Sequence, residues 1–280
     1  MIKLGIFGDQ TTNQQLLTQV NALPEVESVG IYFSGNVDIG TDFEMFSSPG
    51  RLMEASDAIL VLTNKSISHD LVKIILRNSK PVYLQSVPNL HIKEIKELVD
   101  LEKEAGIVTS IYNPFTYNPY LSLFASQYDK PFLINLRTCF ESAAIKPSLE
   151  LLLLVTALNR IAQSNFKKLD VFGIRNVKEQ LIMSVRLEYE NGCVANFTIT
   201  QENENGLCEI FQKSGIIRFE IESSFYQHFT VNTQQIDAIK HFIERILVQD
   251  KKSGSFDGLM QSVQIVHEIR EHLRFNEIVF

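Results

Sequence analysis

The first seventeen residues constrain the fold of this chain more than any other stretch. An apolar run from Ile2 to Phe7 ends at Gly8, a polar turn follows, and Gln14 opens a helical pattern. A short apolar strand, a glycine and then a helix is how a dinucleotide-binding βαβ unit begins, and the pyrophosphate of such a unit lies on the helix N-terminus. The start of the chain therefore predicts a parallel α/β sheet.

The turn after this strand departs from the complete G-x-G-x-x-G phosphate-binding pattern. Gly8 holds the first glycine position, whereas Gln10 and Asn13 hold the second and third. Gly8 either lies under a bound phosphate or only makes the turn. Four residues of the turn either offer hydroxyl and N–H donors to an anion or form an N-cap cluster for the helix: Gln10, Thr11, Thr12 and Asn13. The turn therefore predicts the fold and leaves the cofactor open.

Strands and helices alternate through residues 1–112. The predicted strands are 1–7, 26–33, 57–63, 81–85 and 107–112, and the predicted helices are 14–22, 48–55, 70–77 and 92–105. This alternation predicts a Rossmann-type, doubly wound parallel sheet. Prolines, asparagines and aromatic residues crowd into residues 113–120, which we interpret as a hinge. We therefore expect a first domain over residues 1–116.

The second predicted domain, residues 117–280, has a different pattern. The predicted elements are an apolar helix over 147–163, strands over 132–138, 169–174, 181–189, 194–200, 207–212 and 216–221, and helices over 234–248 and 257–273. Asn191-Gly192 is a strong hairpin signal between two of these strands. We expect an α+β domain with an open, mainly antiparallel mixed sheet. The sheet face without helices predicts a homodimer or a higher homo-oligomer.

Other candidate cofactor-binding residues follow the ends of predicted strands, because ligands of open α/β sheets bind at the carboxyl edge. Ser34 stands near the place where an NAD site carries an acidic residue, and it either donates to a ribose or phosphate oxygen or is a plain turn serine. Thr63 and Asn64 stand at the end of the third predicted strand, and Gln85 ends the fourth. The alternative for Thr63 and Asn64 is an ordinary strand-end turn.

Charge and cysteine content exclude several classes of function. The net charge of −7 argues against a nucleic acid as the main partner, because a basic patch would be expected. The three cysteines are widely spaced and predict neither a zinc site nor a disulfide framework, which fits a reducing cytoplasm. The N-terminus lacks a signal-peptide pattern, and no apolar run is long enough to span a bilayer. We expect a cytoplasmic protein without a membrane partner.

The order and spacing of several short motifs resemble the Gfo/Idh/MocA family, named for glucose-fructose oxidoreductase and inositol 2-dehydrogenase. The matching stretches, which together span nearly the whole chain, are 3–8, 52–64 followed by His69, 79–85, 187–199 and 214–219. The resemblance implies a Rossmann domain, a C-terminal sheet used for oligomer contacts, and NAD(P)-dependent oxidation or reduction of sugars, inositols and related polyols.

The sequence departs from this family at the residues that the family uses for chemistry. Ser86 or Val87 stands in the place of the lysine in the family's Glu-Lys-Pro motif. Glu150 and Leu154 stand where the family has an Asp and, four residues later, a His. None of Ser86, Val87 and Leu154 can relay a proton at neutral pH.

A surviving hydride transfer would need another proton acceptor, and the candidate catalytic residues are His69, Tyr112 and Tyr117. Two functions follow from the sequence. One is an oxidoreductase that acts on a sugar or polyol with weakly bound NAD or NADP. The other is a non-catalytic ligand-binding or assembly module that has lost the cofactor and keeps the dehydrogenase fold.

Overall fold

The computed structural model divides the chain into two compact units. The first unit comprises Met1–Tyr112 and Val231–Met260, and the second comprises Asn113–Thr230 and Gln261–Phe280. The residues that the structure describes are 1–10, 12–33, 43–63, 67–88, 91–116, 130–139, 147–175, 181–200, 206–221, 232–250 and 255–275.

The first unit is built on a sheet of five parallel strands in the order β2-β1-β3-β4-β5. The strands are β1 (Ile2–Gly8), β2 (Val26–Phe33), β3 (Ala58–Leu62), β4 (Val82–Leu84) and β5 (Thr109–Ile111). All five side chains of β3 are buried, as expected for a parallel strand covered on both faces. The strand order reverses between β1 and β3, which makes their carboxyl ends the topological switch point of the sheet. The predicted doubly wound parallel sheet is confirmed.

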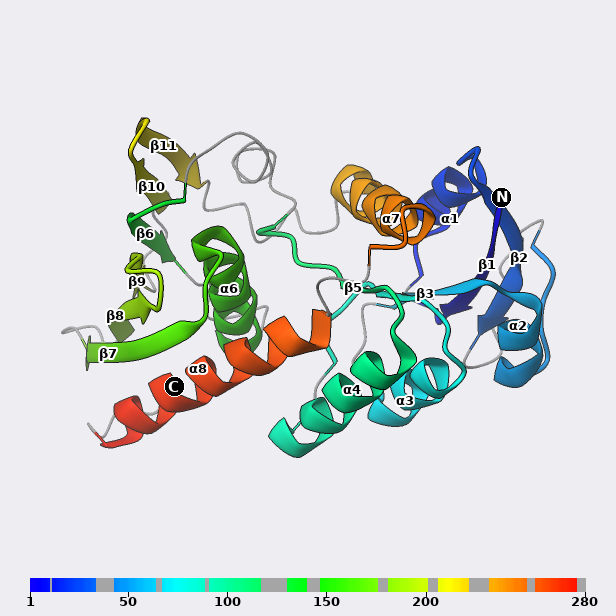
Figure 1. The fold of residues 1–280 in the computed structure, drawn as a ribbon, viewed down its shortest axis with the longest axis horizontal. Helices are drawn as coiled ribbons and strands as arrows, with labels where there is room; N and C mark the ends of the chain where they lie inside the picture. Colours follow the sequence, from blue (N-terminus) through cyan, green and yellow to red (C-terminus); the bar gives the residue numbers. More distant parts are fainter. Residues whose placement is uncertain are drawn as a thin grey trace. The chain divides into compact units, whose positions relative to one another are not determined.

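Helices cover both faces of this sheet, with α1 and α7 on one side and α3 and α4 on the other (Figure 1). The helices that connect the strands are α1 (Gln14–Asn21), α2 (Pro49–Ala55), α3 (His69–Arg77) and α4 (Ile92–Ala105). Local sequence sets their ends. Ser48 caps α2 by accepting from the N–H of Arg51, and Gly106 ends α4 in the left-handed region, at φ 58°.

A segment near the C-terminus returns to the first unit. It contains α7 (Asn232–Leu247) and the first residues of α8 (Ser255–Phe275). Helix α7 packs on α1, and the ring of Phe242 lies 6.0 Å from that of Tyr83 on β4. The predicted domains, 1–116 and 117–280, differ from these units at this segment. The sequence pattern predicts the segment as part of the second domain, whereas the structure places it in the first unit. An amphipathic pattern indicates which face of a helix is buried and does not indicate against what.

A buried polar cluster attaches the returning segment to β5 and α4. Thr109 donates its hydroxyl to the Glu102 carboxylate, which also accepts from the N–H of Phe256, with 3.4 Å between N and O. The N–H of Ser255 donates to Thr109 Oγ1 at 3.0 Å, and Arg245 Nη1 donates to the Thr109 carbonyl at 2.9 Å. Burial raises the pKa of Glu102, although its hydrogen bond with Thr109 partly opposes this shift.

The second unit contains a six-stranded mixed sheet in the order β11-β10-β6-β9-β8-β7. The strands are β6 (Leu133–Cys139), β7 (Phe166–Arg175), β8 (Leu181–Tyr189), β9 (Val194–Thr200), β10 (Gly206–Gln212) and β11 (Gly215–Ile221). Only the β6–β9 pair is parallel among these six strands; the other neighbours are antiparallel, as predicted. The turn at Asn191-Gly192 joins β8 to β9, so the predicted hairpin is confirmed.

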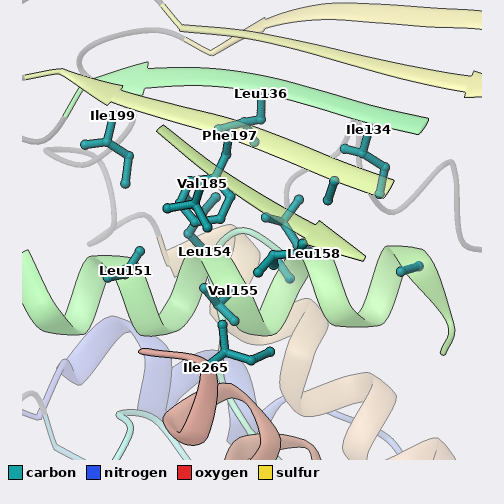
Figure 2. Packing of buried hydrophobic residues seen from close by; sticks show 14 of the residues in the cluster. Ile134, Leu136, Leu151, Leu154, Val155, Leu158, Val185, Phe197, Ile199 and Ile265 are labelled. Atoms are coloured by element: carbon teal, nitrogen blue, oxygen red, sulfur yellow. The ribbon is translucent and has the colours of Figure 1, made fainter. Parts of the chain in front are cut away.

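One face of this sheet packs on α6 (Pro147–Ala162), and α6 in turn packs on α8. Figure 2 shows Leu154 of α6 pointing toward Val185 and Phe197 of the sheet, whereas Val155 points toward Ile265 of α8. The helix is therefore apolar on two sides, which explains its long run of leucines.

Candidate functional site

The switch point between β1 and β3 is bridged by the chain's own side chains. Thr12 Oγ1 accepts from the N–H of Asp9 at 2.9 Å and donates to the carbonyl of Leu62, the last residue of β3, at 2.6 Å. Thr63 Oγ1 donates to Asp9 Oδ2 at 2.7 Å. Asp9 and Thr12 are buried, with exposed fractions of 5% and 8%. Internal hydrogen bonds thus join the ends of β1 and β3 at the place where a parallel sheet usually receives a ligand, and we call this hydrogen-bonded arrangement the closure of the switch point.

Gly8 is required by this closure. A Cβ atom at Gly8 would lie 2.7 Å from Thr12 Oγ1 and 2.8 Å from the ring of Phe33. The glycine thus lets the Thr12 side chain approach the end of β1. Packing against Thr12 and Phe33 therefore explains why a glycine stands at this position, without a bound phosphate.

The N-terminus of α1 is also satisfied from within the chain. Asn13 Oδ1 accepts from the N–H of Gln15 at 2.9 Å and from that of Leu16 at 3.3 Å. The N–H of Thr12 donates to the Asp9 carbonyl at 2.9 Å. These are backbone donors of the kind that would hold a phosphate at a helix N-terminus. The N-cap interpretation of this turn therefore accounts for Asn13, which stands at the third glycine position.

The structure places the described cofactor-binding candidates at one edge of the sheet. Gly8, Thr63 and Gln85 end or follow β1, β3 and β4, and all lie at the carboxyl edge. Thr12 and Thr63 are brought together through Asp9, whereas Gln10 is exposed and Gln85 is buried. Three further candidates lie outside the described residues: Thr11, Ser34 and Asn64.

The residue that the sequence analysis missed is Asp9. In the sequence Asp9 is only one residue of the polar turn after the first strand. A carboxylate directly after the first glycine of the pattern is the signal that could have revealed it, because this position borders the place of the pyrophosphate.

The described catalytic candidates are held within the first unit. His69 begins α3, and its Nε2 lies 3.2 Å from Glu97 Oε2 on α4. Glu97 also pairs with Lys73, and this hydrogen bond lowers the pKa of Glu97. Tyr112 follows β5 and is 5% exposed. Tyr117 lies outside the described residues. His69 therefore ties α3 to α4.

The positions of the expected lysine and histidine carry no base. Ser86 and Val87 follow β4 and are half-buried. Leu154 is 1% exposed in the apolar core of the second unit, where it cannot contact a ligand, and Glu150 is buried as well. Within the described part of the chain, no cluster of His, Cys, Asp and Glu could hold a metal ion, and no helix is long and apolar enough to cross a membrane.

No family model matches the sequence, and no curated protein matches it. Solved structures do match over nearly the full length. The UDP-N-acetylglucosamine 3-dehydrogenase GnnA from Acidithiobacillus ferrooxidans has a TM-score of 0.76 at 12% identity, covering 96% of this chain and 97% of GnnA. The dehydrogenase MviM from Clostridium difficile has a TM-score of 0.72 at 14% identity, covering 97% of this chain and 99% of MviM.

A third match is GenD2 from gentamicin A biosynthesis, solved in complex with NAD. Its TM-score is 0.68 at 10% identity, and the match covers 95% of this chain and 93% of GenD2. These proteins share the fold of the chain. The predicted resemblance to Gfo/Idh/MocA-type dehydrogenases is thereby confirmed for the fold. The low sequence identity of these matches is consistent with a divergent chain.

Proposed function

We propose that this chain is a non-catalytic ligand-binding or assembly protein built on a dehydrogenase scaffold. The observation that carries the proposal is the closure of the switch point by Asp9, Thr12 and Thr63. The hydrogen bonds that join these residues occupy donors near the place of a pyrophosphate, and Asp9 adds a buried carboxylate there. A dinucleotide would have to displace these contacts before it could bind in the usual way.

The repulsion between the Asp9 carboxylate and a bound phosphate can be estimated from Coulomb's law. Two unit charges about 4 Å apart interact by roughly 4 kcal/mol at an effective dielectric constant of about 20. An ionised Asp9 next to a phosphate oxygen would therefore weaken dinucleotide binding by about a thousandfold. A site with micromolar affinity for NAD(P) would fall to the millimolar range, where a nucleotide contributes little as a cofactor.

The second candidate function is an NAD(P)-dependent oxidoreductase that acts on a sugar or polyol. The full-length match to dehydrogenases supports it, since one of these, GenD2, was solved with NAD. Three of the predicted cofactor-binding residues, Gly8, Thr63 and Gln85, lie at the carboxyl edge of the sheet, which also supports it. Hydride transfer would then depend on a proton acceptor other than the lysine and histidine of the family.

Titration of the purified full-length protein with NADH and NADPH separates the two functions. Nicotinamide fluorescence and the thermal midpoint would be followed up to millimolar nucleotide. A ligand at about ten times its dissociation constant stabilises a protein by about 1.4 kcal/mol. We expect neither signal to respond. Saturable binding below about 0.1 mM, together with turnover of any member of a sugar and polyol panel, would overturn the proposal in favour of the oxidoreductase.

A further inference from the structure

The first turn of α8 is held in the first unit by side chains from outside its own helix. The N–H of Ser255 donates to Thr109 Oγ1 at 3.0 Å, and its hydroxyl donates to the Thr109 carbonyl at 2.9 Å. The N–H of Phe256 donates to Glu102 Oε1 at 3.4 Å, and the Thr109 hydroxyl donates to the same oxygen. The first N–H groups of a helix need acceptors, and an acidic side chain is favourable there. Thr109 and Glu102 therefore cap α8 from 146 and 154 residues earlier in the chain.

The two carboxyl oxygens of Glu102 differ in their partners. Oε1 accepts from Thr109 and Phe256, whereas Oε2 is buried and has no hydrogen-bond partner among the described residues. Glu102 as a whole is 4% exposed, and Phe256 is 0% exposed. A buried oxygen without a donor costs more free energy on an ionised carboxylate than on a neutral acid. The surroundings of Oε2 therefore favour the protonated form of Glu102.

The elements packed around Glu102 also carry charged side chains, and these lie in pairs. Lys103 on α4 pairs with Asp257 on α8 at 3.1 Å, and Arg245 on α7 lies 3.6 Å from Asp250, which follows α7. Lysine, arginine and aspartate side chains ordinarily change charge outside the range from about pH 5 to about pH 8, whereas a carboxyl group that burial keeps protonated can titrate within it. A titration in this range that acts on the first turn of α8 therefore points to Glu102.

We propose that Glu102 is a pH-dependent latch for the first turn of α8. The protonated side chain holds this turn on β5. Loss of the proton to solvent opens the turn, so that water reaches both oxygens of the carboxylate. Because only the open form carries the negative charge without burying it, the open form binds fewer protons, and a rise in pH favours opening.

The contacts of the neighbouring helix limit the opening to α8. Arg245 on α7 donates to the Thr109 carbonyl at 2.9 Å, and this hydrogen bond does not involve Glu102. Helix α7 therefore stays on β5 when the first turn of α8 opens. The ion pair of Lys103 with Asp257 is exposed on both sides and contributes too little to hold the turn closed by itself.

The latch acts on the one described helix or strand that the two units share. The residues of α8 up to Met260 belong to the first unit, and those from Gln261 onwards belong to the second, where Ile265, Ile269 and Leu273 lie in the apolar core. Opening of the first turn removes contacts of α8 with the first unit and leaves its contacts in the second unit in place. The latch therefore makes the attachment of this shared helix depend on pH, whether or not the first unit binds a dinucleotide.

Amide hydrogen exchange of the full-length protein, resolved by NMR, tests the latch. Protection, the factor by which exchange is slower than in an unstructured chain, is measured for the amides of Ser255 and Phe256 and, as an internal reference, for Phe242 in the middle of α7. Between the pKa values of Glu102 in the open and the closed turn, the opening equilibrium should rise by up to about tenfold per pH unit. We expect protection at Ser255 and Phe256 to fall at least about threefold between about pH 5 and about pH 8, and protection at Phe242 to stay constant.

Two variants of α4 separate the latch from other effects of pH. Glu102→Gln keeps an acceptor oxygen for the N–H of Phe256 and cannot lose a proton, so it should abolish the pH dependence of protection. Glu104→Gln changes an exposed carboxylate on the same helix and should preserve this dependence. Constant protection in the wild type, or a pH dependence that survives in Glu102→Gln, would overturn the latch. An equal fall at Phe242 would also overturn it, because the first unit would then be opening as a whole.

Titration of the Glu102 carboxyl group itself gives a second readout that needs no variant. The NMR signal of its carboxyl carbon should change over the same pH range in which protection at Phe256 falls. A carboxyl group that is only structural would ionise inside a closed turn. Ionisation of Glu102 without a loss of protection at Phe256 would therefore overturn the proposal.

Discussion

Replacement of Thr12 by valine should destabilise the first unit strongly for a substitution that preserves shape. The Thr12 hydroxyl accepts from the Asp9 N–H at 2.9 Å and donates to the Leu62 carbonyl at 2.6 Å. Valine fills the same volume and makes neither bond. Each buried polar group left without its partner costs about 1–3 kcal/mol, and two such groups are involved. We therefore expect Thr12→Val to lower the free energy of unfolding by about 2–6 kcal/mol.

The assay is urea-induced unfolding of the full-length protein, followed by far-UV circular dichroism. Thr18→Val is the matched control, because the exposed Thr18 hydroxyl only donates to the Gln14 carbonyl one turn earlier in α1. This control should change the free energy of unfolding by less than about 0.5 kcal/mol. If Thr12→Val were as mild as Thr18→Val, the closed turn would not contribute to stability as described here.

Two further predictions concern buried titratable groups. Burial raises the pKa of Glu102 in the folded chain above its unfolded value, so this group's contribution to stability is complete below the unfolded pKa and is lost as the pH rises through the folded pKa. Glu102→Gln should therefore flatten the decline in thermal midpoint as the pH rises above about 4, whereas the exposed Glu104→Gln should leave this decline in place. An unchanged slope in Glu102→Gln would refute this account. Burial also raises the pKa of Cys193 to about 11 and that of Cys208 to about 12. A thiol reagent at about pH 8 should accordingly leave both unmodified in the native protein and label them after denaturation, and rapid labelling of the native protein would contradict their burial.

The parts of the fold that depend on local sequence could be predicted. The apolar residues of β3 are consecutive, which is the pattern of a parallel strand buried on both faces. Gly106 and Ser48 mark helix ends, because a left-handed residue and a hydroxyl cap have local causes. The hairpin at Asn191-Gly192 follows from the same kind of turn chemistry.

The parts that depend on long-range packing could not be predicted. The sequence pattern of α7 is amphipathic, and nothing in it indicates that Phe242 packs on Tyr83 of β4. The role of Asp9 was hidden for the same reason, because its partner Thr63 lies 54 residues away along the chain. The contacts of the site therefore could not be predicted from the sequence alone, whereas the scaffold that carries the site could.

The closure of the switch point is tested most directly by rebuilding the glycine pattern. The variant Asp9→Ala/Gln10→Gly/Asn13→Gly removes the buried carboxylate, the second-position side chain and the internal cap. Asp57→Ala is the control, because Asp57 lies at the amino edge of the same sheet. The account predicts that the rebuilt variant, provided that it stays folded by circular dichroism, binds NADH at least tenfold more tightly than the wild type and the control. Equal NADH dissociation constants for the wild type and a folded rebuilt variant would contradict it.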